Sequence, residues 1–364
     1  MGQPVPKRIK DMNPSFGEER ITTLLVDGSN ILELSSLGDR RVSSDGREVG
    51  GIFQFFLQLK LMLQKGNFRY VYVFWDGDNS GYYRYLMNES YKSNRDKNYV
   101  VEEGLSDYMK EYNRRLKAMQ DHIFKRHRKE PSDERKRHKD IFYQQRRVIM
   151  ECLEELFIRQ CVCDKVEADD LIGYYVMHKK PNERIVIMSN DRDLTQLIAD
   201  DVIVYVQSLK QFVTRYNHTL LMGYSHENVL LKKIICGDSS DSIKGIKGVG
   251  ESTLIKNFPQ IKSRKVELSE IMQCARDLNE RRVAEKKKPL KWADNIVNCV
   301  TDGPQGKRVY EINEKIIDLS HPIMTDESVE LMKSMMYKPL DPEGRSLDNL
   351  YKTIVEAGVE ELSE

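Results

Sequence analysis

Short apolar runs recur along residues 21–260 and alternate with longer stretches of helical pattern. Four of the runs are rich in β-branched and aromatic residues, which is typical of buried strands. They are ITTLLVD (21–27), YVYVFWD (70–76), RIVIMSN (184–190) and VIVYV (202–206). Residues 161–163 predict a shorter strand, and residues 211–214 predict a hairpin partner for the last of the four. Because helical patterns separate most of these runs, the sequence predicts an α/β fold with a mainly parallel central sheet and helices on both faces.

The segments between the predicted strands carry signals of their own. Residues 51–63 place apolar side chains at helical spacing, which predicts a helix packed on the sheet. A turn is expected at Gly28–Asn30, directly after the first strand. Further helices are expected to begin near Ala168 and at Asp191–Asp193. Apolar residues return at 148–157, where the pattern is again that of a core segment.

Three segments lie outside this core pattern. Residues 1–20 are polar, and we expect a flexible N-terminal tail. Residues 79–147 are charged and poor in aliphatic side chains, which indicates helices that project from the core. Residues 259–364 are mostly helical in pattern and contain turn signals, so they are expected to form a helical C-terminal region. The main α/β domain is therefore expected within residues 21–258.

The distribution of charge is more informative than its sum. The formal net charge of the 364-residue chain is +1, which does not by itself indicate a nucleic-acid-binding protein. Residues 110–147, however, contain fourteen Lys and Arg against six Asp and Glu, an excess of eight. Such a run can bind a phosphate backbone by releasing counterions, although a charged run can also be a solvated loop. No apolar stretch is long enough to span a bilayer and no signal peptide is visible, so we expect a cytoplasmic protein.

The six cysteines do not match a zinc-binding pattern. Cys161 and Cys163 are separated by one residue, and no Cys or His pair lies nearby at zinc-finger spacing. On a strand this spacing directs both thiols to the same face, so small buried hydrophobic side chains are the preferred interpretation. A reducing compartment fits that interpretation.

Nine carboxylates follow the predicted strands or lie in one later segment. They are Asp27, Asp76, Glu167, Asp169, Asp170, Asp191, Asp193, Asp238 and Asp241. Ligands of an open parallel sheet bind in the crevice outside the carboxyl ends of the strands, where the first seven acids are expected to converge. These acids would repel one another without a cation, and hard divalent metal ions prefer oxygen ligands. A single Asp after a strand is more often a turn or helix-capping residue, but three acids within residues 167–170 and two within 191–193 favour a two-metal site.

A glycine-rich segment follows the last two of these acids. Residues 244–250 read KGIKGVG, with glycines at 245, 248 and 250. This spacing allows a tight turn between two short helices, in which backbone N–H groups approach a phosphate and Lys244 and Lys247 add positive charge. A glycine-rich turn is as often a plain connector. The segment is not a Walker loop, because the GxxxxGK[ST] spacing is absent.

Six motifs occur in an order that resembles the flap endonuclease and 5′-nuclease superfamily. They are VDGSN, FWDG, ESYKSNRD, EADD, SNDRDL and GDSSDSIKGIKGVG. In particular the chain is similar to phage 5′→3′ exonucleases such as the ribonuclease H of T-even phages, over residues 21–260 and more loosely beyond. It departs from that subgroup in its longer, more charged insertion after the second motif and in its intact glycine-rich segment. The resemblance implies a PIN-like 5′-nuclease fold in which residues 21–258 are the catalytic domain, with a helical arch near 79–147 and a helix–hairpin–helix near 228–258.

The resemblance also implies a role for each candidate residue. The first metal site that it implies comprises Asp27, Asp76, Glu167 and Asp169. The second comprises Asp191, Asp193, Asp238 and Asp241, with Asp170 between the two sites or just outside them. Contacts of the arch with the nucleic acid are implied for Arg84, Tyr91, Lys92 and Arg95. Contacts of the helix–hairpin–helix with a duplex backbone are implied for Lys244, Gly245, Lys247, Gly248 and Gly250.

The implied activity is hydrolysis of a phosphodiester with two Mg²⁺ ions, for which Mn²⁺ can substitute. One ion would lower the pKa of a bound water and the other would stabilise the leaving 3′ oxygen, while Arg84 and Lys92 offset charge on the phosphate and Tyr91 stacks on a terminal base. The expected substrates are RNA primers or 5′ flaps on DNA and RNA–DNA duplexes during replication, and the products would carry a 5′-phosphate. The resemblance further implies a K⁺ ion at the helix–hairpin–helix. We expect a monomer, with a single-stranded-DNA-binding protein or a sliding clamp as partner.

Two other classes of protein remain open. One is a non-catalytic, structure-specific DNA-binding protein of the same fold, which would have no reason to keep the full set of carboxylates. The other is a toxin-like single-strand ribonuclease of PIN architecture. That class is usually much shorter, with fewer acids and no helix–hairpin–helix, so residues 245–250 argue against it.

Overall fold

The central sheet is mainly parallel, as predicted. The computed structural model describes residues 22–39, 41–93, 133–338 and 343–363. Six strands form one sheet in the order β3-β2-β1-β4-β5-β6. They are β1 (Thr22–Asp27), β2 (Tyr70–Trp75), β3 (Arg159–Val162), β4 (Arg184–Ser189), β5 (Val202–Val206) and β6 (Gln211–Val213). Strands β1 to β5 pair in parallel, and β6 forms the predicted antiparallel hairpin with β5.

The order of the strands reverses next to β1. From β1 the chain builds outward through β2 and β3 on one side, and it then returns to add β4, β5 and β6 on the other. In open α/β sheets such a reversal leaves a crevice at the carboxyl ends of the two central strands, because the connections leave them in opposite directions. The ends of β1 and β4, at Asp27 and Ser189, therefore border the position where a ligand site is expected.

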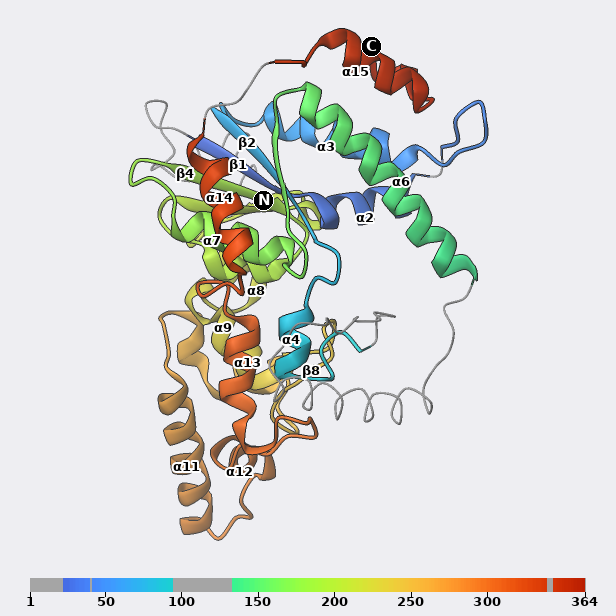
Figure 1. Cartoon of the computed structure of the whole chain (residues 1–364). Helices are drawn as coiled ribbons and strands as arrows, with labels where there is room; N and C mark the ends of the chain where they lie inside the picture. The colour runs from blue at the N-terminus through green and yellow to red at the C-terminus, as the bar shows by residue number, and fades with distance from the viewer. Residues whose placement is uncertain (1–21, 40, 94–132, 339–342, 364) are drawn as a thin grey trace, which may run out of the picture.

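One face of the sheet is covered by four helices. They are α2 (Gly28–Gly38), α3 (Gly50–Leu63), α6 (Asp133–Glu155) and α15 (Leu347–Glu356). Successive side chains of a strand point to opposite faces, so Leu24 and Val26 of β1 pack on this side, whereas Leu25 packs on the other. Phe55 of α3 stacks on Trp75 of β2 with ring centroids 5.8 Å apart. Figure 1 shows that α15, near the C-terminus, returns to this layer, where Ile354 joins its buried cluster.

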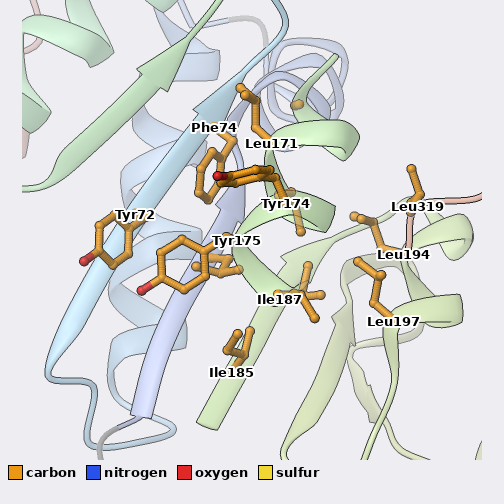
Figure 2. Close-up of a cluster of buried hydrophobic side chains, with 14 of the residues drawn as sticks. Tyr72, Phe74, Leu171, Tyr174, Tyr175, Ile185, Ile187, Leu194, Leu197 and Leu319 are labelled. Atoms are coloured by element: carbon orange, nitrogen blue, oxygen red, sulfur yellow. The ribbon is translucent and has the colours of Figure 1, made fainter. Parts of the chain in front are cut away.

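The opposite face is covered by α7 (Ala168–Met177), the 3-10 helix η2 (Arg192–Leu197) and α14 (Asp326–Tyr337). Figure 2 shows Tyr175 of α7 against Tyr72 of β2, with Ile187 of β4 in the same cluster. The ring centroids of Tyr72 and Tyr175 are 4.9 Å apart. Leu319, which precedes α14, belongs to the same buried group. Helices therefore cover both faces, and the predicted fold class is confirmed.

The lower part of Figure 1 is mostly helical and has a buried cluster of its own. Its helices are α8 (His218–Met222), α9 (Val229–Cys236), α10 (Glu251–Asn257), α11 (Leu268–Ala284), α12 (Lys291–Val297) and α13 (Val309–Ile317). A small hairpin of β7 (Gly237–Asp238) and β8 (Ile243–Lys244) lies between α9 and α10. Ile235, Leu254, Ile271 and Ile296 share the cluster, so its packing continues across residue 258, where the sequence suggested a domain boundary.

Short helices complete the described chain. Helix α4 (Tyr82–Met87) lies beside β8 in Figure 1, where Ser90 Oγ donates to the carbonyl of Ser242 at 3.2 Å. The short 3-10 helices other than η2 are η3 (Gln207–Leu209), η4 (His226–Asn228), η5 (Pro259–Lys262), η6 (Gly306–Arg308) and η7 (Glu360–Ser363). Within the described ranges no helix is long and apolar enough to cross a membrane.

One local expectation is wrong and another is confirmed in a shorter form. The turn expected at Gly28–Asn30 is the first turn of α2, which begins there because Asp27 Oδ1 accepts a hydrogen bond from the backbone N–H of Asn30 at 3.1 Å. The helix expected to begin at Asp191–Asp193 is present as the short 3-10 helix η2, which Asp191 caps by accepting the N–H of Asp193 at 2.8 Å. Cys161 and Cys163 are buried free thiols, as expected, with their sulfurs 3.8 Å apart.

Candidate active site

The carboxyl ends of β1 and β4 hold one connected group of polar side chains. Asp27, the last residue of β1, accepts a hydrogen bond from Ser189 Oγ at 2.7 Å. Ser189 ends β4, and its Oγ accepts the backbone N–H of Asp191 at 2.9 Å. Asp191 in turn accepts the N–H of Asp193 at 2.8 Å. The three predicted acids are thus fixed at the reversal of strand order, as expected from the position of the crevice.

Asp76 links the end of β2 to the start of α7. It follows β2 directly, and its Oδ1 accepts the backbone N–H of Ala168 at 2.9 Å. The N–H of Asp76 donates to Ser29 Oγ at 2.8 Å. Glu167 is the N-cap residue of α7, and Asp169 and Asp170 lie in its first turn. Negative side chains are stabilised at a helix N-terminus by the exposed N–H groups and the helix dipole, so the EADD motif places three acids at this edge.

Two cations and a phenol from the segment after β2 converge on these acids. Arg84 of α4 is buried, and its Nη1 and Nη2 grip both oxygens of Asp170, with 2.8 Å between Nη2 and Oδ1. Arg84 Nη1 also donates to Glu167 Oε2 at 2.8 Å. Tyr91 OH donates to the same oxygen at 2.7 Å, and Lys92 pairs with Glu167 Oε1. The arch residues predicted to contact the nucleic acid therefore contact the carboxylates in this structure.

Asp241 and Asp238 reach the site from the β7–β8 hairpin. The backbone N–H of Lys92 donates to the carbonyl of Asp241 at 2.7 Å, and Lys92 Nζ lies 4.0 Å from Asp241 Oδ1. Asp238 Oδ2 lies 2.5 Å from the ammonium of Lys233, which also pairs with Asp193. A pocket joins these side chains. It is lined by Arg84, Tyr91, Glu167, Asp169, Asp193, Asp238, Asp241, Ile243, Ile316, Ile317 and Leu319.

Lys233 is a site residue that the sequence reasoning missed. It belongs to α9 and is only 7% exposed, between the buried Leu231 and Ile235. A lysine inside the apolar run VLLKKII is the signal that could have found it, because an ammonium is rarely buried without a carboxylate partner. Asp238 is five positions after Lys233, but Asp193 belongs to the distant helix η2, so only the fold brings all three side chains together.

The carboxylates repel one another strongly. Burial, reinforced by Asp76 and Asp191, raises the pKa of Asp27 to about 7. Burial together with Asp191 raises the pKa of Asp193 to about 7 despite the nearby lysine. Burial and the charges of Asp191 and Asp27 also raise the pKa of Asp169 well above its usual range. Additional positive charge at this edge would therefore stabilise the ionised carboxylates.

The carboxylate oxygens at this edge suit hard divalent metal ions, although several of the carboxylates pair with lysine or arginine in this structure. Among the described residues, no group of three or more His, Cys, Asp or Glu side chains is arranged to hold an ion. The reason is visible in the contacts: Asp193 and Asp238 face Lys233, and Glu167 faces Lys92 and Arg84. The candidate ligands are all carboxylate oxygens, which suit Mg²⁺ and Mn²⁺. A bound ion would have to replace the ammonium contacts.

The glycine-rich segment forms a turn beside this pocket. A Cβ on Gly245 would lie 2.2 Å from the carbonyl carbon of Cys236, so only glycine allows the segment to approach α9 so closely. Lys244, Gly248 and Gly250 are exposed, and Lys247 Nζ pairs with Asp302 at 2.7 Å. The turn stands between α9 and α10 with the β7–β8 hairpin. Arg95, the remaining predicted contact, lies outside the described residues.

Sequence comparison gives a family match and several relatives that align over part of their length. The family model described as "5'-3' exonuclease, N-terminal resolvase-like domain" matches residues 22–225, more than half of the chain. Over 161 residues the chain is 30% identical to DNA polymerase I of Bacillus subtilis, covering 43% of this chain and 18% of that protein. Over 137 residues it is 32% identical to a 5'-3' exonuclease of Mycoplasmopsis pulmonis, covering 36% of this chain and 46% of that protein. The chain thus spans less than half of these two relatives.

Solved structures share the fold over most of both chains. A T5 5′-exonuclease bound to divalent metal ions (zinc) superposes with a TM-score of 0.58 at 16% identity, covering 92% of this chain and 98% of that one. A bacteriophage T5 D15 flap endonuclease in a pseudo-enzyme–product complex with DNA and metal ions superposes with a TM-score of 0.56 at 17% identity, covering 93% and 99%. At this identity the likeness concerns the fold alone.

Proposed function

The chain belongs to the 5'-3' exonuclease family with an N-terminal resolvase-like domain, and from that premise we propose that it is a structure-specific, divalent-metal-dependent 5′→3′ exonuclease and flap endonuclease. The observation that carries the proposal is the meeting of carboxylates from β1, β2, α7, η2 and the β7–β8 hairpin at one edge of the sheet. A protein that only bound DNA would gain nothing from acids that raise one another's pKa at a polyanion-binding surface.

Eight of these acids are the proposed metal ligands. One site comprises Asp27, Asp76, Glu167 and Asp169, and the other comprises Asp191, Asp193, Asp238 and Asp241. Mg²⁺, or Mn²⁺ in its place, would supply Lewis acidity to activate water and to stabilise charge on the leaving 3′ oxygen. Asp170 is not a ligand in this proposal, because it is fully buried against Arg84 and the N–H of Ile323 (2.8 Å). Unlike Glu167, it does not line the pocket.

The chain's own cations orient the substrate and the carboxylates. Arg84 fixes α4 against α7 through Asp170 and against α13 through the carbonyl of Ile316 at 2.8 Å, so we assign it a positioning role. Lys92 pairs with Glu167 and its Nζ lies 4.0 Å from Asp241 Oδ1, and we propose that it contacts the scissile phosphate. Tyr91 is 3% exposed here, so stacking on a terminal base requires that it leave Glu167. No protein nucleophile is needed for this reaction.

The proposed substrates are RNA primers or 5′ flaps on DNA duplexes during replication. The relatives support the DNA part of this choice, because they include a DNA polymerase, 5'-3' exonucleases and a flap endonuclease in complex with DNA and metal ions. Lys244, Lys247 and the glycines at 245, 248 and 250 would grip the duplex backbone, with a K⁺ ion on the carbonyls of that turn. We further propose a cytoplasmic monomer that works with a single-stranded-DNA-binding protein or a sliding clamp.

The test is cleavage of three labelled substrates by the full chain. A 5′-labelled DNA flap, a nicked RNA–DNA hybrid and a blunt duplex are incubated with Mg²⁺ or with EDTA. We expect metal-dependent release of short 5′-labelled products from the flap and the hybrid, and their lengths separate exonuclease from flap cleavage. Tight binding without cleavage in Mg²⁺ and in Mn²⁺ would leave a non-catalytic, structure-specific DNA-binding protein.

A further inference from the structure

A second basic segment runs from the end of α11 to the start of α12, outside the site described above. Residues 281–291 contain six Lys and Arg against one acid, an excess of five. The basic residues are Arg281, Arg282, Lys286, Lys287, Lys288 and Lys291. All except the half-buried Arg282 are exposed. Lys287 pairs with Glu285 at 2.7 Å, whereas Lys286, Lys288 and Lys291 have no ion-pair partner within the described part of the chain.

This basic turn, residues 281–291, is an ordered structure. The N–H of Lys286 donates to the carbonyl of Val283 at 2.9 Å, and the N–H of Lys287 donates to the carbonyl of Arg282 at 2.8 Å. These two bonds close the helix in the Schellman arrangement. Arg282 Nε donates to the carbonyl of Lys288 at 2.9 Å. Asn279 then binds both the N–H and the carbonyl of Leu290, at 2.7 and 3.1 Å, and so fixes the exit from the turn.

The turn is also attached firmly to the glycine-rich segment. Asn295, one helical turn after Lys291, donates to the carbonyl of Lys247 at 2.8 Å. The ring of Trp292 meets that of Phe258 edge to face, with centroids 6.1 Å apart. Because one turn of helix rises about 5 Å, the basic turn begins close to the surface proposed to grip a duplex. A turn of B-DNA spans about 34 Å, so one duplex can reach both surfaces.

One residue of the turn is unfavourable for the fold alone. Lys286 has a φ of +57°, at the position after a helix where glycine is usual because a side chain is disfavoured there. Glycine would therefore suit this backbone at least as well as lysine. The side chain of Lys286 is exposed, so its charge is available to a ligand.

We propose that the basic turn is a second contact surface for duplex DNA, which extends the track of the glycine-rich segment along the phosphate backbone. The proposal rests on the nuclease function proposed above, because it concerns the same substrate. Three lysines that have no ion-pair partner among the described residues can each neutralise a phosphate and release counterions. Their contacts carry no sequence information, which suits an enzyme that recognises structure.

The test measures duplex affinity against salt concentration for the full chain and two variants. The first variant is Lys286→Gly with Lys288→Gln, which removes two charges, and its glycine suits the left-handed backbone. The matched control is Lys333→Gln with Lys352→Gln, two exposed lysines of α14 and α15. Binding of a flap substrate with long duplex arms, and of a single-stranded oligonucleotide of the same length, is measured in Ca²⁺ from 50 to about 200 mM salt. Thermal unfolding checks that each variant is folded.

The K286G/K288Q variant should lose about 5- to 20-fold in duplex affinity at low salt. The slope of log affinity against log salt concentration should become shallower by the equivalent of roughly two phosphate contacts. Its melting temperature should equal or exceed that of the wild type. An unchanged duplex affinity and slope, or an equal loss on the single strand, would overturn the proposal. Failure of the nuclease function is distinguished separately, because it would appear as absent cleavage by the wild type in Mg²⁺.

Discussion

Lys233 Nζ lies 2.5 Å from Oδ2 of Asp238, and the same ammonium pairs with Asp193. Asp193 follows β4 at the sheet edge, whereas Asp238 belongs to the β7–β8 hairpin. One buried cation therefore joins the hairpin to the sheet and sets the distance between two proposed metal ligands. Although burial alone would raise it, this ammonium and the hydrogen bonds from Ser240 lower the pKa of Asp238 to about 2.

Replacing Lys233 with Met should destabilise the metal-free protein. Removal of one partner of a buried ion pair typically costs about 3–5 kcal/mol, because a charge is left uncompensated. We expect the unfolding temperature in EDTA to fall and Mg²⁺ to raise it by more than in the wild type, since the ion replaces the lost ammonium. Circular dichroism melts with and without Mg²⁺ measure both effects. Lys315→Met, at an exposed pair with Glu311, is the control and should change little. A K233M protein with wild-type melting in EDTA would contradict the assignment.

Arg84 should matter for stability as well as for activity. Its guanidinium holds Asp170 with two hydrogen bonds, and both side chains are buried. Arg84→Ala should lower the free energy of unfolding by about 3–5 kcal/mol, and Arg84→Lys should recover only part of the loss because lysine cannot make the forked contact. Urea unfolding in EDTA measures both. An arginine that served only to contact a phosphate would leave the urea midpoint unchanged when removed.

Gly77, directly after Asp76, should not accept a side chain. A Cβ there would lie 1.6 Å from the carbonyl oxygen of Cys163, which is backbone and cannot move aside cheaply. Gly77→Ala should therefore destabilise the fold by more than about 2 kcal/mol and displace Asp76. Gly250→Ala is the matched control, because a Cβ at Gly250 meets nothing within 4 Å. Equal unfolding midpoints for the two variants would show that the backbone at Gly77 does not approach that of Cys163 as closely as described.

His218 should make stability depend on pH. Burial lowers its pKa to about 4, and its Nδ1 donates to the carbonyl of Tyr224 at 2.7 Å. The unfolded histidine has a pKa of about 6.5, so the unfolded chain binds the proton first as the pH falls. The neutral ring thus contributes fully above pH 6.5, and up to about 3 kcal/mol is lost toward pH 4. His218→Gln should flatten the profile of unfolding free energy against pH between about pH 6.5 and pH 4. The difference between the variant and the wild type is used, because the carboxylates contribute equally to both profiles. Parallel profiles would contradict the prediction.

The sequence predicted the sheet well because its signals are local. The runs that end in Asp27 and Asp76 are apolar and β-branched, and such patterns need no knowledge of distant contacts. The acids after the strands could be assigned to one edge for the same reason, since the carboxyl ends of parallel strands share it. Gly28 was assigned to a turn because the capping role of the preceding Asp27 was not recognised.

What the sequence did not predict depends on long-range contacts. Lys233 binds acids contributed by two other segments, and Arg84 was assigned to a phosphate because its partner Asp170 is 86 positions away. Residues 259–364 were expected to be mostly helical, but the sequence did not indicate that Ile354 and Met332 of that region pack against the sheet layers. No local pattern indicates which core an amphipathic helix will join.

The central claim is that the carboxylates at the sheet edge hold the metal ions that drive cleavage, and Asp169→Asn tests it most directly. Asp169 lies within the acid group and lines the pocket, and the change removes its charge while keeping its size. The measurement is the single-turnover rate on a 5′-flap substrate in Mg²⁺, with Asp326→Asn on exposed α14 as the control. We expect a loss of roughly 10³-fold for D169N, because metal-ion stabilisation of the transition state is worth several kcal/mol, with flap affinity retained and the control near the wild type. A D169N rate within a few-fold of the wild type would contradict the account.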